Sequence, residues 1–190
     1  MARGEIGFVG LGIMGKPMVR NLMKADYSVT VYDIVAESVE ELATDGAIAA
    51  SSAAEVASNN PIVITMVPDS PQSEAAILGP GGVLEGASEG DTVIDMSSIA
   101  PASSQKIAAA CEEAGVNFLD APVSGGETGA IDGTLAVMVG GKKDIFDANF
   151  DIMSAMSGSI VLCGPYGAGN TTKLANQIIV AGNIAALGEA

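Results

Sequence analysis

Closely spaced glycines after a short apolar run impose the strongest constraint on how this chain folds. Residues 6–9 have the pattern of a buried parallel strand, and Gly10, Gly12 and Gly15 follow with the spacing G-x-G-x-x-G. Gly10 allows a tight turn, Gly12 lets a pyrophosphate approach the backbone, and Gly15 lets the next helix pack closely on the strand. The pattern therefore predicts a phosphate-binding turn at the start of a helix, where free N–H groups and the helix dipole favour anions.

A carboxylate at the end of the second predicted strand extends this pattern. Residues 28–32 form the strand and Asp33 follows it. A carboxylate at this position accepts hydrogen bonds from both hydroxyls of an adenosine ribose and repels a 2′-phosphate, which favours NAD over NADP. A glycine turn with a purely structural role is the alternative, but the ordered strand, glycines, helix and acid favour a cofactor site. The residues predicted to bind NAD in this region are Gly10, Gly12, Ile13, Met14, Gly15 and Asp33.

The composition suits a glycine-rich α/β domain. The chain has 190 residues, of which 48% are hydrophobic, 24 are glycine and 4% are aromatic. This length is sufficient for one well-buried domain with a small addition. Apolar strands alternate with helical segments along the chain, so we expect a Rossmann-type, doubly wound and mostly parallel sheet.

Charge and residue usage exclude several classes of function. The formal net charge is −15, which argues against nucleic acid or an anionic membrane as a partner. The chain has no histidine, so it holds no Ser-His-Asp triad, His-based metal site or His general base. Cys111 and Cys163 lie far apart in no metal-ligand spacing. We expect free thiols, no metal and a cytoplasmic location.

The most apolar segment lies near the end of the sequence. Residues 174–188 are apolar apart from Asn176, Gln177 and Asn183 and a final glycine, and they follow Lys173. The polar side chains favour a core helix over a membrane span. The N-terminus has no signal-peptide pattern.

Two loops after predicted strands are candidates for cofactor contacts. In a doubly wound sheet, such loops lie at the carboxyl edge near the dinucleotide. Residues 61–69 contain one strand, and we expect the backbone of Met66, Val67 and Pro68 to contact the cofactor, a plain strand end being the alternative. Residues 92–99 form another strand, after which Ser98 either caps the helix that begins at Pro101 or binds the nicotinamide ribose.

A serine followed by two glycines ends the strand predicted at residues 117–123. The N–H groups of Ser124, Gly125 and Gly126 can form an anion-binding concavity, and a simple tight turn is equally compatible with these residues. Residues 134–139 and 159–162 are predicted as further strands, with a helix at residues 143–156 between them.

The last candidate residues stand at the head of the apolar helix. Lys173 and Asn176 are three residues apart, so their side chains project from one helix face. An apolar environment would desolvate the Lys173 amine, lower its pKa and suit it to proton transfer. The segment alone slightly favours a surface lysine that reaches solvent.

Four stretches together resemble the β-hydroxyacid dehydrogenase family, and the resemblance covers the chain from its first strand to its last residue. They are residues 9–18, 120–126, 138–141 and 173–177. The resemblance implies a hydride transfer with NAD, in which Lys173 is the general acid or base and Asn176 holds the substrate oxygen. It further implies that Ser98 lies near the nicotinamide and that three residues of one turn bind the substrate carboxylate. The residues implied to bind the carboxylate are Ser124, Gly125 and Gly126.

The residue identities in three stretches narrow the expected substrate within this family. Residues 12–18, 95–99 and 173–181 are most similar to members that reduce 2-hydroxy-3-oxopropionate to glycerate. The alternatives are 3-hydroxyisobutyrate, glyoxylate or another small semialdehyde. A further alternative is an NAD-binding module without catalysis. Many relatives have a second asparagine where this chain has Gln177, which leaves the role of Gln177 open. A phosphosugar acid is disfavoured because the chain has few basic residues.

The resemblance also implies a domain division. Family members are substantially longer and carry an all-helical C-terminal domain. We expect an NAD-binding domain at residues 1–163, and at 164–190 a glycine-rich loop with the first part of an interdomain helix. The 190-residue chain alone is then expected to bind NAD, to turn over weakly or not at all, and to self-associate through its apolar helix. A full-length form would be a homo-oligomer.

Overall fold

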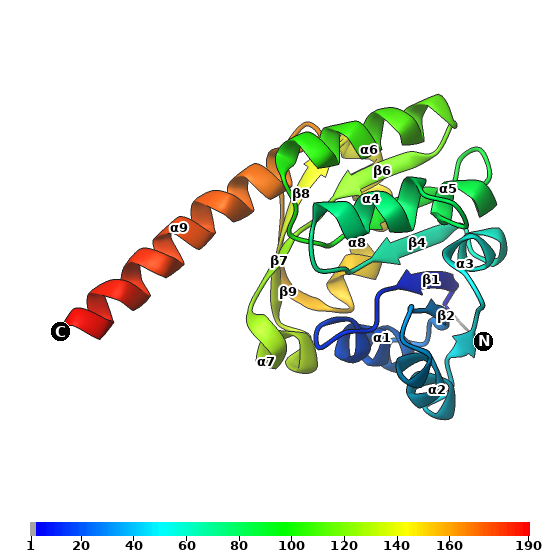
Figure 1. The fold of residues 1–190 in the computed structure, drawn as a ribbon, viewed down its shortest axis with the longest axis horizontal. Coiled ribbons are helices and arrows are strands. Elements are labelled where there is room, and N and C mark those ends of the chain that lie inside the picture. The colour runs from blue at the N-terminus through cyan, green and yellow to red at the C-terminus, as the bar shows by residue number, and fades with distance from the viewer. Residues whose placement is uncertain (1–2) are drawn as a thin grey trace.

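A computed structural model describes residues 3–190 of the chain, which form one sheet with helices on both faces (Figure 1). Strands and helices alternate along most of the chain. In order, the elements are β1 (Glu5–Val9), α1 (Gly15–Lys24), β2 (Ser28–Tyr32), α2 (Ala36–Thr44), β3 (Ile48–Ala49), α3 (Ala53–Asn59), β4 (Ile62–Thr65), α4 (Ser70–Leu78), α5 (Val83–Gly86), β5 (Thr92–Asp95), α6 (Pro101–Glu113), β6 (Asn117–Asp120), β7 (Val123–Ser124), α7 (Gly126–Asp132), β8 (Leu135–Gly141), α8 (Lys143–Ser154), β9 (Ser157–Gly164) and α9 (Ala168–Glu189).

The sheet has the order β3-β2-β1-β4-β5-β6-β8-β7, and β9 pairs with β8. The first six strands along the chain are mutually parallel, β8 runs antiparallel to both β6 and β7, and β9 is parallel to β8. The strand order reverses between β1 and β4, and in open α/β sheets ligands bind at such a point, beyond the carboxyl ends of the strands. The predicted Rossmann-type, mostly parallel fold is confirmed.

Alternate residues of the central strands supply two separate cores. On β4, Ile64 belongs to the cluster covered by α1, α2 and α8, whereas Val63 belongs to the cluster covered by α3, α4, α5 and α6. On β6, Leu119 and Phe118 divide in the same way. Both faces of these strands are therefore buried, which explains why they read as continuous apolar runs in the sequence.

Two predicted strands end earlier than the sequence suggested. The strand predicted at residues 92–99 ends at Asp95, because the chain turns and the N–H of Ser97 donates to Asp95 Oδ1 at 3.0 Å. The strand predicted at residues 117–123 is divided into β6 and β7 around Pro122, which has no N–H to continue a ladder. The short helices α5 and α7 were not predicted.

The long final helix begins at Gly167, which has a φ of 86°, and extends away from the sheet (Figure 1). Its first turns are packed, but from Leu174 onward most of its side chains are exposed, with exposed fractions of 74% at Ile178 and 78% at Leu187. A helix was correctly predicted here, but its assignment to a core was wrong for the described residues. Among residues 3–190, no helix combines the length and apolar character needed to cross a membrane.

Candidate active site

Each glycine of the first turn can be assessed by what a side chain at its position would contact. A Cβ on Gly10, where φ is 99°, would lie 2.2 Å from the carbonyl oxygen of Met66. A Cβ on Gly15 would lie 2.0 Å from the carbonyl oxygen of Gly10. By contrast, a Cβ on Gly12 would meet nothing within 4 Å. Gly10 and Gly15 are thus required by the fold, whereas Gly12 leaves open backbone surface, as a bound pyrophosphate requires.

Asp33 connects the glycine turn to the end of β2. Its Oδ2 accepts a hydrogen bond from Leu11 N at 2.5 Å, and its Oδ1 accepts one from Val35 N at 2.8 Å. Asp33 therefore lies at the same edge as the turn, where the ribose interaction was predicted. The carboxylate also has a structural task that the sequence pattern did not show.

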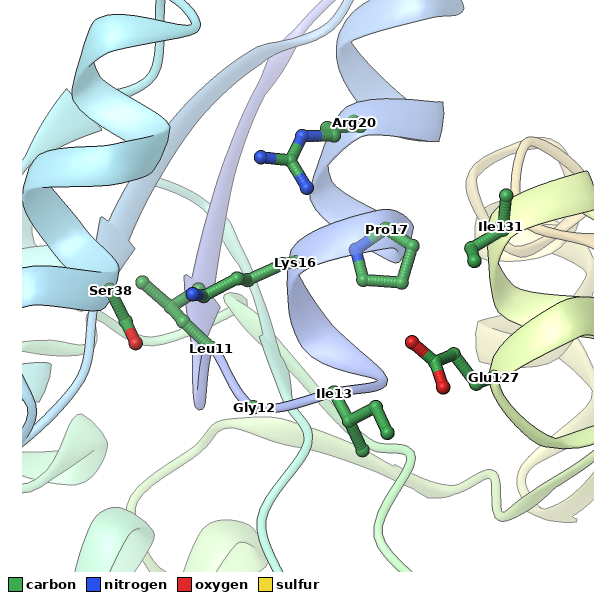
Figure 2. A pocket seen from close by; sticks show the side chains of 9 residues that line it. All are labelled: Leu11, Gly12, Ile13, Lys16, Pro17, Arg20, Ser38, Glu127 and Ile131. Carbon is green, nitrogen blue, oxygen red and sulfur yellow. The ribbon is translucent and has the colours of Figure 1, made fainter.

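A pocket of about 300 Å³ lies beside the turn (Figure 2). Its walls come from the turn itself and from α1, α2 and α7. The lining residues are Leu11, Gly12, Ile13, Lys16, Pro17, Arg20, Ser38, Glu127 and Ile131. Figure 2 shows the carboxylate of Glu127 directed from α7 towards the turn that carries Ile13.

Two cations in this pocket, Lys16 and Arg20, were not singled out from the sequence. Lys16 pairs with Glu41, and the Arg20 guanidinium lies 2.7 Å from both Glu41 Oε1 and Asp45 Oδ2. These hydrogen bonds raise the pKa of Arg20 above its ordinary value. In the sequence, the only indication that Lys16 lines this pocket is its position directly after Gly15.

The loop after β4 lies against the glycine turn, as expected from its place in the sheet. Its backbone donors are already engaged: Met66 N donates to Val9 O at 2.9 Å, and Val67 N donates to Ser97 Oγ at 2.9 Å. Pro68 is exposed and has no N–H. Cofactor contact through these residues stays a prediction, and it would have to use carbonyl groups or side chains.

Ser98 is exposed at the end of β5 and does not cap the following helix. The N-cap of α6 is Ala100, which makes no side-chain capping hydrogen bond. The capping alternative is therefore wrong. The proposed contact of Ser98 with a nicotinamide ribose stays a prediction.

The serine-glycine-glycine turn lies beside the final helix. Gly125 and Gly126 have φ values of 138° and 62°, and the chain then enters α7. Asn176 Nδ2 donates a 3.4 Å hydrogen bond to Ser124 Oγ. The two segments implied to bind substrate therefore meet, although they are far apart in the sequence.

Helix α7 lies between this turn and the pocket beside the glycine turn, where the cofactor is expected. Asn21, on α1, is buried and its Nδ2 donates to Ala130 O at 2.7 Å. Because Glu127 and Ile131 on α7 also line the pocket, one short helix connects the turn at residues 124–126 to the pocket beside the glycine turn.

Lys173 is buried, with 7% of its surface exposed. Desolvation lowers the pKa of its amine below the ordinary lysine value. The surface-lysine interpretation, which the segment alone slightly favoured, is therefore wrong. An amine of this kind loses its proton more readily than an ordinary lysine, which suits it to proton transfer.

A buried carboxylate fixes the start of the helix that carries Lys173. Asp120 Oδ1 accepts from Gly167 N at 2.7 Å, and Asp120 Oδ2 accepts from Asn170 N at 3.0 Å. Burial raises the pKa of Asp120 to about 6. Its register partner on β5, Asp95, is also fully buried, and burial raises the pKa of that carboxyl too.

Glycines let the helix approach the sheet at backbone distance. A Cβ on Gly169 would lie 2.3 Å from Met138 O, and one on Gly140 would lie 2.4 Å from Asp120 Oδ1. The first turn of α9 therefore rests directly on β6 and β8. Within the described part of the chain, no cluster of three or more acidic or cysteine side chains is placed to hold a metal ion.

The fold and the glycine turn together define a dinucleotide-binding domain. Residues 5–164 match the family described as the NAD binding domain of 6-phosphogluconate dehydrogenase. The chain is 43% identical over 186 residues to 2-hydroxy-3-oxopropionate reductase of Escherichia coli K12, covering 98% of this chain and 63% of that protein. It is 39% identical over 180 residues to human mitochondrial 3-hydroxyisobutyrate dehydrogenase, covering 95% and 54% respectively.

A solved structure extends the likeness to three dimensions. Mycobacterium tuberculosis 3-hydroxyisobutyrate dehydrogenase with L-serine matches with a TM-score of 0.87 and 34% identity, over 95% of this chain and 61% of that one. The chain belongs to the β-hydroxyacid dehydrogenase family, and its matched domain is an NAD-binding domain. It spans less than two thirds of the length of these relatives.

Proposed function

We propose that this protein is an NAD-dependent oxidoreductase that reduces 2-hydroxy-3-oxopropionate to glycerate, with Lys173 as the general acid. The observation that carries the proposal is the buried amine of Lys173, which lies on the helix face that also presents Asn176 to Ser124. The 43% identity to the E. coli reductase supports this choice of substrate.

The glycine turn and Asp33 would hold the dinucleotide. Gly12 exposes backbone to the pyrophosphate, and Asp33 stands at the end of β2 where the adenosine ribose is expected. The other proposed cofactor contacts come from the turn and from the loops after β4 and β5. They are Gly10, Ile13, Met14, Gly15, Met66, Val67, Pro68 and Ser98. The bound nicotinamide supplies the hydride.

The substrate would lie between the serine-glycine-glycine turn at residues 124–126 and α9. Backbone N–H groups of Ser124, Gly125 and Gly126 would bind the carboxylate of the aldehyde acid. Asn176 would hold the carbonyl oxygen, and Lys173 would give that oxygen a proton as the alcohol forms. In the opposite direction, the neutral amine would accept the hydroxyl proton. In this scheme, residues 1–163 are the NAD-binding domain and residues 164–190 begin the connection to a helical domain.

A parallel comparison of substrates tests the proposal. A full-length form of the protein would be assayed by NADH oxidation with 2-hydroxy-3-oxopropionate, glyoxylate and succinic semialdehyde, and by NAD reduction with 3-hydroxyisobutyrate. We expect the highest kcat/KM for 2-hydroxy-3-oxopropionate. A higher value for 3-hydroxyisobutyrate would replace the substrate but keep the enzyme class.

The non-catalytic alternative is separated by one variant. Lys173→Ala should abolish turnover while NADH still binds, as measured by fluorescence titration. If a full-length form of the unaltered protein binds NADH but turns over none of these substrates, a binding module without catalysis becomes the better description.

A further inference from the structure

Asn170 is a polar side chain that the proposed mechanism does not use, yet it is almost completely buried, with 1% of its surface exposed. Its Oδ1 accepts from Ile99 N at 3.0 Å, and its Nδ2 donates to Ser104 Oγ at 3.0 Å. Its own N–H donates to Asp120 at 3.0 Å. One residue of α9 is thus bonded to the loop after β5, to α6 and to the end of β6.

These bonds reach both halves of the proposed site. Ile99 directly follows Ser98, the residue expected beside the nicotinamide ribose. Lys173 follows Asn170 by three residues on the same helix face. The Asn170 amide therefore connects the cofactor side of the site to the turn that carries the amine, through groups that are screened from water.

Burying an amide costs free energy unless its polar atoms are hydrogen-bonded. An apolar side chain would fill the same space without that cost. Here, both ends of the amide are satisfied, and the bonds define a single rotation and depth for the first turn of α9. The glycine contact at Gly169 allows the helix to approach the sheet, and Asp120 holds the backbone N–H groups at its start, while the Asn170 amide adds side-chain bonds to the loop after β5 and to α6.

We propose that Asn170 is a positioning residue, which sets the place of the Lys173 amine relative to the cofactor loop at Ser98–Ile99. The proposal rests on the proposed function insofar as it concerns turnover. The geometric part, that the amide holds the amine in its buried position, can be tested without any substrate.

The test uses two variants and a matched control. Asn170→Ala removes the amide. Ser104→Ala removes only one of its partners and guards against a loss of folding in the first variant. Thr172→Val is the control, since the hydroxyl of Thr172 is exposed and bonds only to Ala168 O of its own helix, at 2.8 Å.

The first readout is the chemical reactivity of Lys173. Competitive acetylation as a function of pH, followed by mass spectrometry, gives the pKa of the Lys173 amine in the purified protein. We expect the pKa to move upward, towards the ordinary lysine value, in Asn170→Ala and by a smaller step in Ser104→Ala. Thr172→Val should leave it unchanged.

The second readout is kinetic. We expect kcat to fall by about 10- to 100-fold in Asn170→Ala, as a small displacement of a catalytic group produces, with the Kd of NADH within about twofold of the unaltered protein. The proposal is overturned if Lys173 reactivity in both variants equals that of the control, even if kcat falls. If a full-length form of the unaltered protein shows no turnover, the proposed function fails, and the acetylation profile still decides the role of Asn170.

Discussion

The backbone N–H of Leu11 donates to a carboxylate oxygen of Asp33 at 2.5 Å, which ties the glycine turn to the end of β2. Asp33→Asn keeps an oxygen acceptor but loses the charge that strengthens this bond and the expected ribose contacts. Since hydrogen bonds to charged groups contribute about 1.5–3 kcal/mol, we expect the Kd of NADH to rise by about 10- to 100-fold. Binding of NADPH should weaken less, because the repulsion of its 2′-phosphate is removed.

Isothermal titration of both cofactors measures these changes. Asp151→Asn, on the exposed face of α8, is the matched control and should leave both affinities unaltered. An unchanged preference for NADH in Asp33→Asn would show that Asp33 serves only the fold.

Two glycine substitutions should separate cofactor binding from folding. Gly12→Ala places a Cβ where no atom lies within 4 Å, so the melting temperature should change by no more than about 2 °C. The same Cβ would obstruct the pyrophosphate, and we expect at least about tenfold weaker NADH binding. Gly15→Ala instead places a Cβ 2.0 Å from Gly10 O and should lower the melting temperature markedly. Differential scanning fluorimetry with and without NADH measures both effects.

Removing the buried amine of Lys173, the proposed general acid, should stabilise the protein. Lys173→Met keeps the length of the side chain, and we expect turnover to fall by about 10²- to 10⁴-fold, the usual share of a general acid, with NADH binding retained. Because burial lowers the pKa of Lys173, the folded state holds its charged form at a cost at neutral pH.

The sign of the stability change follows from proton linkage. Below the lowered pKa of Lys173 the cost is fully present, and it is relieved as pH rises towards the unfolded-state pKa of 10.5. Lys173→Met should thus have a higher melting temperature than the unaltered protein at pH 7, and the difference should shrink at pH 10. Lys143→Met, at an exposed position, should show neither effect. A lower melting temperature in Lys173→Met would contradict the desolvated state.

The buried carboxylate of Asp120 predicts that stability falls as pH rises, which is the opposite of the effect expected from Lys173. Its pKa is raised from 3.8 to about 6, so the folded state holds a proton that the unfolded state releases earlier. Stability from this group is therefore greatest below pH 3.8 and is lost as pH rises to about 6, by on the order of 3 kcal/mol.

Urea denaturation between pH 4 and 8 would measure this loss. Asp120→Asn should remove its share of the slope, leaving a smaller slope from Asp95, whose pKa burial also raises. Asp151→Asn should keep the full slope. Equal slopes in the unaltered protein and in Asp120→Asn would place the titrating group elsewhere.

The sequence was most informative where a local pattern has one structural solution. The glycine turn and the apolar strands follow from short-range rules. They sufficed to predict the Rossmann-type sheet and the position of Asp33.

Features that depend on contacts between distant segments were harder to predict. The burial of Lys173 arises because glycines in β8 and α9 bring the helix onto the sheet, and no periodicity within residues 164–190 records this. The bonds of Asn170 span 50 to 71 residues of sequence, so their existence could be found only from coordinates. The same is true of the α7 wall that brings Glu127 to the cofactor pocket.

The contact of Gly140 and Gly169 with neighbouring backbone has a consequence for the diversity of such enzymes. Main-chain atoms around Gly169 let the first turn of α9 lie directly on the sheet, and the side chains of Asp120 and Asn170 hold it there. In the proposed scheme, substitutions farther along the helix then leave the Lys173 amine in place. Reaction chemistry and substrate choice can in this way evolve independently on one scaffold.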